Sequence, residues 1–599
     1  MTAPDAARPS FGRGLFHGRP RIDLLNLPGP LSRLDEESED FLARLRVLCT
    51  EIDGRRIERE NRIPREVIAD LRNIGAFCIK IPKDYGGLGL PGVCYHRALM
   101  LVSTTHPALG ELLAAHQAIG LPQPILLFGT EEQKREFLPR CVREISAFVL
   151  TEPDIGNDPF RMHTTAVHSA DGSGYTLDGV KSWATNGTLA ELLVVMAMVP
   201  PSDQGPGGMT AFVVEARDPG VTVEHRSAFL GLRGLENGTL RLHEVLVPAC
   251  NRIGGEGDGL EVALAAQGTG RLSLPAVCAA AAKWSLKIAR EWSRVRVQWD
   301  RPIGEHEAVA GKIAYIAATA FALEAMVEVS GRHADAGTVD TGTEAELAKL
   351  YASEKAWTIA DELVQIRGGR GYETAESAAA RGEKGVPAEQ VLRDLRIGRI
   401  FDGSSEALRV FIAQEALTGG VETGRLPDIV GATRVGAWYA RALLSPGASV
   451  LRPADFGALA THVRYVERAS RRLARRLGRP RWADVEERQL FLGRIVDIAA
   501  ELYAMSASCV YARARAEDRD AATALADTFC RQARGRVAEL FDRLRRNTDD
   551  HDRAVARQVL DDRYTWLEDG ILDPSIDGPW IAEPARDPSR PANERRNAA

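Results

Sequence analysis

Three segments of the chain combine aromatic, hydroxyl and turn residues at a density that suits the binding of a flat ligand. They are residues 148–158 (FVLTEPDIGND), residues 181–187 (KSWATNG) and residues 392–405 (LRDLRIGRIFDGSS). An indole such as that of Trp183 can stack on a planar ring while neighbouring hydroxyls hydrogen-bond to the edge of that ring. Trp183 could equally be an ordinary core residue, so the residue types alone leave two interpretations open.

Signatures of several other chemistries are missing from the sequence. No GxGxxG follows a predicted strand, and no GxxxxGK[ST] occurs. Residues 368–371 (GGRG) follow a predicted helix instead of preceding one, which is typical of a helix C-cap. The eight cysteines form no CxxC pair and the histidines are dispersed, so we predict no metal site.

Composition and charge narrow the class of protein. The 599 residues carry 76 Lys plus Arg against 82 Asp plus Glu, and 76 − 82 gives a net charge of −6, which argues against a nucleic-acid binder. A hydrophobic content of 45% predicts folded domains. The beginning of the chain has no apolar signal-peptide core, and no long uninterrupted apolar run predicts a membrane span. Scattered cysteines favour a reducing compartment, and we expect a cytoplasmic protein.

The spacing of apolar residues predicts the helices and strands that position these three segments. Helical spacing dominates except between about 146 and 256, where β-rich runs alternate with period two and predict a small antiparallel barrel or sandwich. The fold class is therefore α+β and mostly α. Long helices are expected over 260–297, 308–337 and 343–367. The predicted units are an extended or disordered arm (1–34), a helical domain (35–145), a β-domain (146–256), a helical bundle (257–420) and an extra helical domain (421–599).

The three segments, in this order, resemble motifs of the acyl-CoA dehydrogenase family. Residues 148–158 are similar to its Leu-Thr-Glu-Pro-x-x-Gly-Ser-Asp, and residues 181–187 to its Lys-x-Trp-Ile-Thr-Asn-Gly. Residues 365–372 (QIRGGRGY) and 393–404 match its Gly-Gly motif and its Arg-Asp and Glu-Gly-Thr motifs. The match is colinear from about 55 to 417. It implies a helical N-terminal domain, a β-domain and a C-terminal four-helix bundle. The extra region beyond 420 is similar to the very-long-chain branch, whose members are usually dimers.

The resemblance implies FAD as cofactor and assigns residues to it. Thr151 and Thr185 should approach the flavin edge, and Trp183 should pack against the ring. A neighbouring subunit should complete the site with Gln365 and its glycines, so the resemblance implies a homodimer. The full expected FAD set is Phe148, Leu150, Thr151, Asn157, Trp183, Thr185, Arg296, Gln298, Trp299, Gln365, Gly368, Gly369, Ser404 and Glu406. Asn157 stands where the family has Ser, and Glu307 where it has Gln.

In the family, a carboxylate removes the α-proton of an acyl thioester while the β-hydride passes to the flavin. The resemblance places Asp402 at the position of this base, with Gly403 and Arg271 on the substrate side. The family has Glu there, and Asp is shorter by one C–C bond of ~1.5 Å. Some members carry the base just before the arginine matched by Arg271, but this chain has Gly270. Glu406 and Glu261 occupy positions that cannot be assigned to the base.

Three interpretations of Asp402 follow. It can serve as the base of a dehydrogenase after a local shift of backbone or substrate, which is the interpretation we favour. It can deprotonate a nitroalkane in a flavin oxidase of the related nitroalkane type. It can also belong to a catalytically weak paralogue that binds acyl thioesters, with Asp402 as a plain turn residue.

We therefore predict an FAD-dependent dehydrogenase of acyl-CoA or acyl-carrier-protein thioesters. Long acyl chains are suggested by analogy with the very-long-chain branch. An electron-transfer flavoprotein is the expected electron acceptor. Residues 373–390 form an insertion relative to the family, and we interpret it as a surface helix and turn instead of a substrate lid.

Overall fold

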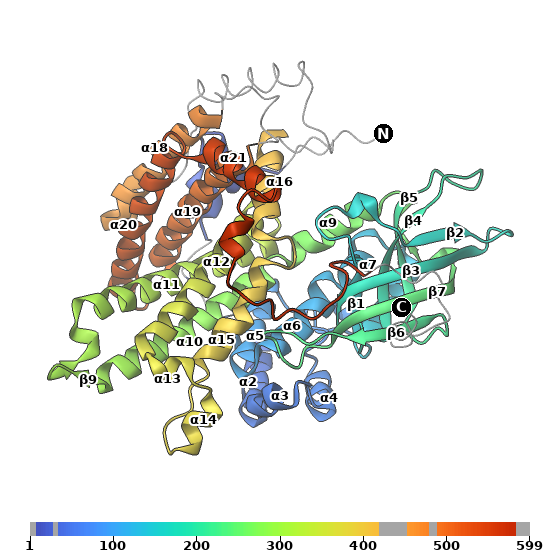
Figure 1. Cartoon of the computed structure of the whole chain (residues 1–599), viewed down its shortest axis with the longest axis horizontal. Helices are drawn as coiled ribbons and strands as arrows, with labels where there is room; N and C mark the ends of the chain where they lie inside the picture. Colours follow the sequence, from blue (N-terminus) through green and yellow to red (C-terminus); the bar gives the residue numbers. More distant parts are fainter. Residues whose placement is uncertain (1–7, 28–30, 32–33, 419–451, 478–487, 583–599) are drawn as a thin grey trace.

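The computed structural model describes residues 8–27, 31, 34–418, 452–477 and 488–582. Helices form one side of the molecule and a β-domain forms the other (Figure 1). The predicted C-terminal domain, 421–599, falls partly outside the described residues. Within 452–477 and 488–568 it is mainly helical, and residues 569–582 follow without a helix.

The segment from 35 to 145 folds into helices with clear start signals. Asp35 accepts a hydrogen bond from the Ser38 backbone N–H, Pro107 begins a helix, and Thr130 and Gln133 form a capping box. The helices are α2 (Glu36–Glu51), α3 (Gly54–Glu60), α4 (Arg65–Asn73), α5 (Gly92–Thr105), α6 (Pro107–Ala114), α7 (Pro122–Phe128) and α8 (Glu131–Cys141).

The β-domain is one eight-stranded sheet in the order β6-β7-β3-β2-β4-β5-β8, with β1 paired to β4. Most pairs are antiparallel, as expected, but β1 runs parallel to β4. This pairing differs from the predicted antiparallel architecture, because period-two alternation shows which residues face the core and not which strand lies alongside. The strands are β1 (Ser146–Val149), β2 (Thr165–His168), β3 (Gly174–Thr185), β4 (Leu192–Val199), β5 (Gly208–Glu215), β6 (Val221–Arg226), β7 (Asn237–Pro248) and β8 (Arg252–Ile253).

The bundle contains a break that the sequence did not reveal. A single helix was predicted over 260–297, but the structure has α9 (Gly259–Gly270) and α10 (Ser273–Val295), with Arg271 and Leu272 between them. The short hairpin β9 (Val297–Gln298) and β10 (Arg301–Pro302) then leads into the rest of the bundle. Its remaining helices are α11 (Glu307–Ala336), α12 (Gly342–Arg367), α13 (Gly369–Tyr372), α14 (Ala375–Ala380), α15 (Ala388–Leu395) and α16 (Ser405–Thr418).

The last described part of the chain packs against this bundle. Its elements are α18 (Ala460–Leu477), α19 (Gln489–Ala514), α20 (Arg519–Arg543), α21 (Asp549–Leu560) and the 3₁₀ turn η10 (Thr565–Glu568). By length and composition α11 and α19 could each cross a membrane. However, 72% and 94% of their apolar windows are buried within the protein, as in central helices of a bundle.

The prediction of an extended or disordered N-terminal arm is wrong for residues 8–27. This segment forms α1 (Phe11–Phe16) and the 3₁₀ turn η1 (Ile22–Leu25), and Leu15 and Phe16 are completely buried. The Ser470 hydroxyl on α18 donates to the Leu15 carbonyl. The arm lacks a helical period because only six residues are helical, and contacts far along the chain hold them.

Candidate active site

The turn that carries Asp402 has an unusual backbone that a lysine holds in place. Asp402 and Gly403 both adopt positive φ, 51° and 85°, in the left-handed region that non-glycine residues rarely occupy. Lys349 Nζ, from α12, donates to the Phe401 carbonyl at 3.0 Å and to the Gly403 carbonyl at 2.6 Å. The two hydrogen bonds bracket Asp402 and offset the cost of its backbone conformation.

The electrostatics around Asp402 favour a proton acceptor with a raised pKa. Burial raises the pKa of Asp402, and the charges of Lys349 and Arg271 oppose that rise. The side chain itself is accessible to solvent. The carboxyl therefore lies among many protein atoms, while part of its own surface remains in contact with solvent.

Arg271 lies at the break between α9 and α10, and an ion pair fixes it there. It pairs with Glu346 of α12, and its guanidinium lies 5.4 Å from the centre of the Phe411 ring. Burial raises the pKa of Glu346, while the Arg271 charge lowers it. The break in the helix therefore places a cation beside the Asp402 turn, which a continuous helix could not do in the same way.

On the β-domain, the first two motif segments form adjacent parts of one surface. The Ser182 backbone N–H donates to the Thr151 carbonyl at 2.8 Å. Trp183 sits at an irregularity of the β3–β7 register with φ 52°, and its side chain is 56% exposed. Asn237 Nδ2 donates to the Trp183 carbonyl and to Thr185 Oγ1, at 3.0 and 3.1 Å. Trp183 is thus an outward-facing ring and not a core residue in this chain.

A contact between domains joins this surface to the Asp402 turn. Asn157 Nδ2, on the loop after β1, donates to Ser404 Oγ at 3.5 Å. Ser404 also caps α16, because its hydroxyl accepts from the Ala407 backbone N–H at 3.3 Å. The structure therefore brings together Phe148, Leu150, Thr151, Asn157, Trp183, Thr185, Asp402, Gly403, Ser404, Glu406 and Arg271.

The other expected FAD residues lie elsewhere. Arg296, Gln298 and Trp299 belong to the β9–β10 hairpin and the turn just before it, and Gln365, Gly368 and Gly369 lie at the end of α12. These two groups are neighbours, since Trp292 Nε1 donates to the Ile366 carbonyl at 3.1 Å. Figure 1 shows β9 and α13 at the end of the bundle opposite the β-domain. Within one chain, the six residues are far from Trp183.

The geometry near Trp183 fits a flat cofactor with a polar edge. A Cβ added at Gly156 or at Gly403 would meet no atom within 4 Å, so the backbone on both sides of the Asn157–Ser404 contact faces open space. Asn237 Oδ1, next to Thr185, is buried without a hydrogen-bond partner. An exposed indole, an unpaired acceptor and an open backbone suit FAD. Which residues hold it stays a prediction.

Two buried charged residues of this site, Lys349 and Glu346, were not predicted from the sequence. Lys349 lies inside an apolar helix, where it is 1% exposed, and Glu346 is buried one turn before it. A charged residue at a position with core spacing was the available clue, but the partner of that charge is a turn about fifty residues away. Among the described residues, no group of three His, Cys, Asp or Glu could hold a metal ion.

Comparisons with known proteins identify the family. The models of the acyl-CoA dehydrogenase N-terminal, middle and C-terminal domains match residues 35–144, 147–245 and 257–417. The chain belongs to the acyl-CoA dehydrogenase family, whose members use FAD.

Individual relatives extend this result beyond the matched domains. The chain is 52% identical to the probable acyl-CoA dehydrogenase FadE10 of Mycobacterium tuberculosis, over 98% of this chain and 94% of the relative. It is 31% identical to the human mitochondrial very long-chain specific acyl-CoA dehydrogenase, over 88% and 83% of the two chains. The crystal structure of an acyl-CoA dehydrogenase complexed with FAD from Bacillus anthracis shares the fold. Its TM-score is 0.73 at 24% identity, over 89% of this chain and 91% of that one.

Proposed function

We propose that this chain catalyses the α,β-dehydrogenation of a long-chain acyl-CoA with Asp402 as the base. The observation that carries the proposal is the Asp402 turn, which Lys349 holds and which the Asn157–Ser404 contact joins to the β-domain. Bound FAD would supply the acceptor for the β-hydride. Trp183, Thr151 and Thr185 would hold and orient it.

Asp402 would take the α-proton of the acyl thioester. Its raised pKa makes the carboxylate a better proton acceptor, and a bound acyl chain would exclude water and raise that pKa further. The backbone N–H of Asp402 has no acceptor among the described residues, so it is free to donate to the thioester oxygen as charge develops there. We propose that the left-handed backbone at Asp402 lets the shorter side chain reach the substrate.

A large cavity beside the site supports a substrate whose thioester is attached to a phosphate-bearing group. It has a volume of about 810 Å³ and lies next to Leu272, one residue beyond Arg271. Arg8, Arg13 and Lys80 line it. Cations in a large cavity suit the phosphates of a nucleotide-like group. Arg13 also pairs with Asp340, so its charge is partly offset before any ligand binds.

We also propose a homodimer in which Arg296, Gln298, Trp299, Gln365, Gly368 and Gly369 of one subunit, called the far group, complete the flavin site of the other. Trp299 of the far group and Tyr372 beside it are each 84% exposed. The segment 549–582 has no buried residue, although it exposes Leu560, Trp566, Leu567, Ile571, Leu572, Ile576, Trp580 and Ile581. The tryptophans offer ~150–250 Å² each, and all eight side chains on the order of 1,000 Å², against ~800 Å² per partner in a standard interface. A second copy of this chain is the occupant we propose.

Two further proposals rest on family membership and composition. An electron-transfer flavoprotein is the proposed electron acceptor, as the resemblance implies. A cytoplasmic location is proposed because all eight cysteines are unpaired and seven of them are buried.

The test of the proposed base compares Asp402→Asn with the unchanged protein. Purified protein should be yellow, and an anaerobic long-chain acyl-CoA should bleach the flavin. Asp402→Asn should retain the flavin and lose roughly 10²–10⁴-fold in the rate of bleaching, because a positioned base contributes about that much. Asp361→Asn, an exposed carboxylate on α12, is the matched control and should bleach normally.

Other outcomes would contradict the proposal in different ways. Bleaching by nitroalkanes with rapid peroxide formation in air would indicate an oxidase of the nitroalkane type. A colourless protein that cannot be loaded with FAD would indicate a binding paralogue. Unchanged bleaching by Asp402→Asn would remove this residue from the mechanism.

A further inference from the structure

A cavity of about 120 Å³ runs along one face of α10, close to the Asp402 turn. Leu274, Val277, Ala281 and Trp284 line it at intervals of three and four residues, which is one helical stripe. The stripe begins three residues after Arg271, whose charge acts on Asp402. A chain attached to a carbon at Asp402 and running along α10 would therefore enter this cavity.

Glu111 of α6 also lines this cavity. Its side chain is only 7% exposed, and it has no hydrogen-bond partner among the described residues. Burial and the negative charge of Asp402 raise the pKa of Glu111 to about 8. The carboxyl is therefore largely protonated at pH 7, and it can both donate and accept one hydrogen bond.

A second polar group next to Glu111 is also unpaired. The Ser103 hydroxyl on α5 is buried, lines the same cavity and has no hydrogen-bond partner. Ser103 and Val277 meet at Gly110, where an added Cβ would lie 2.1 Å from Ser103 Oγ and 3.5 Å from Val277 Cγ2. Glu111 and Ser103 thus lie near Val277, partway along the α10 face of the cavity.

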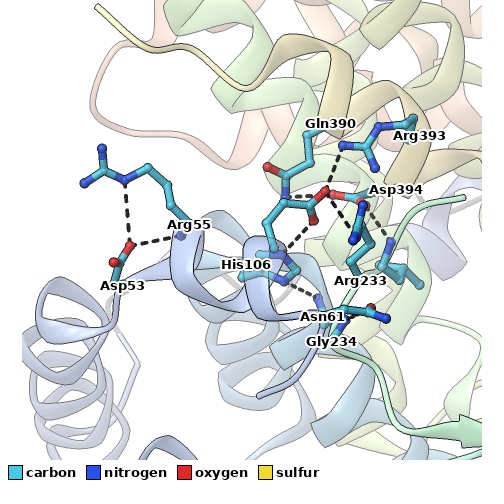
Figure 2. A network of polar contacts seen from close by, with 12 residues as sticks. Asp53, Arg55, Asn61, His106, Arg233, Gly234, Gln390, Arg393 and Asp394 are labelled. Atoms are coloured by element: carbon cyan, nitrogen blue, oxygen red, sulfur yellow. Dashed lines mark hydrogen bonds and ion pairs between the residues drawn. The ribbon is translucent and has the colours of Figure 1, made fainter. Parts of the chain in front are cut away.

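Other polar groups of the cavity have contacts within the protein, and His106 Nε2 lies 3.5 Å from Glu58 Oε2. Figure 2 shows His106, Gln390 and Asp394, three further lining residues, close to one another. Asp394 accepts from the Leu232 backbone N–H at 2.6 Å and from Gln390 Nε2 at 3.3 Å. His106 Nδ1 accepts from the Ala108 backbone N–H at 3.2 Å. These residues close the cavity, whereas Glu111 and Ser103 are left free to bind a ligand.

The depth of this pair indicates where a ligand group would sit. Val277 is six residues beyond Arg271, which corresponds to about 9 Å along a helix. An extended alkyl chain needs at least about six C–C bonds of ~1.5 Å to cover that distance. A plain alkyl chain would bury the Glu111 carboxyl and the Ser103 hydroxyl without partners, which is unfavourable.

We propose that the acyl group of the substrate carries a hydroxyl beyond about its sixth carbon, and that Glu111 and Ser103 bind this hydroxyl. The inference rests on the proposed function, because it places the thioester end at Asp402. A site built to hydrogen-bond a substrate hydroxyl rejects the analogue that lacks it much more strongly than an apolar pocket rejects an extra group.

The experiment compares a saturated straight-chain acyl-CoA with isomers of equal length that carry one hydroxyl near the middle or at the ω end. The flavin-loaded enzyme should prefer one hydroxylated isomer by about tenfold or more in kcat/KM. Glu111→Leu should abolish or reverse this preference. Glu111→Gln should keep it, because an amide also donates and accepts. Ser103→Ala should weaken it severalfold, a second readout if the Leu variant does not fold.

Val102→Ala is the matched control, because Val102 is buried beside Ser103 but does not line the cavity. It should leave the preference unchanged. Equal use of the plain and hydroxylated substrates by the unchanged enzyme would overturn the inference and indicate that water fills the cavity. That result would leave the proposed dehydrogenase intact, whereas failure of every thioester to bleach the flavin would contradict the proposed function itself.

Discussion

At the scale of single residues, the site depends on buried charges that act on one another. Lys349 and Arg271 both lower the pKa of Asp402 against the effect of burial, and Asp402 in turn raises the pKa of Glu111. Burial lowers the pKa of the Lys349 amine, and the negative charge of Asp402 opposes this shift. A substitution at one of these groups therefore changes the protonation of its neighbours as well as its own contacts.

Glu111→Gln should stabilise the protein increasingly as pH rises from 5 to 9. The folded-state pKa, about 8, lies above the usual 4.5, so the stability linked to the bound proton is complete below 4.5 and is lost as pH rises through 8. The variant has no proton to lose and should gain on the order of 1–3 kcal/mol relative to wild type by pH 9. Denaturant titrations across this pH range would measure it. Glu136→Gln, at an exposed position on α8, should show no such trend, and parallel curves for both variants would contradict the prediction.

At the scale of elements, short segments owe their structure to contacts made far away in the chain. The N-terminal helix α1 has six residues, too few to be stable alone, and it packs on α18, α19 and α12. The buried Glu344 carboxylate on α12 accepts from the Gly12 backbone N–H at 2.9 Å and from the Ser10 hydroxyl at 3.0 Å. The arm thus packs the start of the chain against α12 and the C-terminal helices.

Phe16→Ala should lower the stability of the protein by about 3–5 kcal/mol, as expected for truncating a buried aromatic ring. Phe16 is 0% exposed. The thermal unfolding midpoint of the flavin-loaded protein would measure the effect. Phe160→Ala removes the same atoms at a 68% exposed position and should change stability by no more than ~0.5 kcal/mol. Equal midpoints for the two variants would show that the arm is not packed as described.

At the scale of the whole molecule, the predicted flavin-binding residues of one chain fall into two separated groups. The Asn157–Ser404 contact joins the β-domain to the bundle near the Asp402 turn, and the β9–β10 hairpin and α13, which carry or adjoin the far group, lie at the opposite end of the bundle (Figure 1). The segment after α21 runs from the C-terminal helices across the bundle toward the β-domain. Its side chains cover nothing in the single chain, which is the physical reason to propose a second copy as their partner.

Replacing both Leu572 and Trp580 with Ser should shift the proposed dimer toward monomer by tenfold or more in Kd, because large apolar side chains dominate interface energetics. The two residues are 93% and 103% exposed. Analytical ultracentrifugation would measure the change, together with the fraction of flavin retained after dilution. Leu246→Ser on β7, also exposed, is the matched control and should leave assembly unchanged. A monomeric wild-type protein would contradict the proposed dimer.

Motifs and periodicity in the sequence specified the family and the fold class, and they predicted Asp402 as the base. These features are local, because a helix or strand pattern depends on residues a few positions apart, and the motifs around Trp183 and Asp402 are contiguous. The sequence also showed that a short Asp replaces Glu at the base position. It could not show the left-handed backbone that presents this Asp.

The tertiary structure decided what depends on distant residues meeting. The fold brings Lys349 into contact with the Asp402 turn. It also ends α9 before Arg271, where the sequence predicted a continuous helix. The N-terminal arm packs on α18 and α19 for the same reason. Only the fold left Glu111 and Ser103 unpaired in one cavity. Hydrogen-bond satisfaction is a property of three-dimensional neighbours, and for that reason a sequence pattern records which groups are polar but not which of them remain free to bind a substrate.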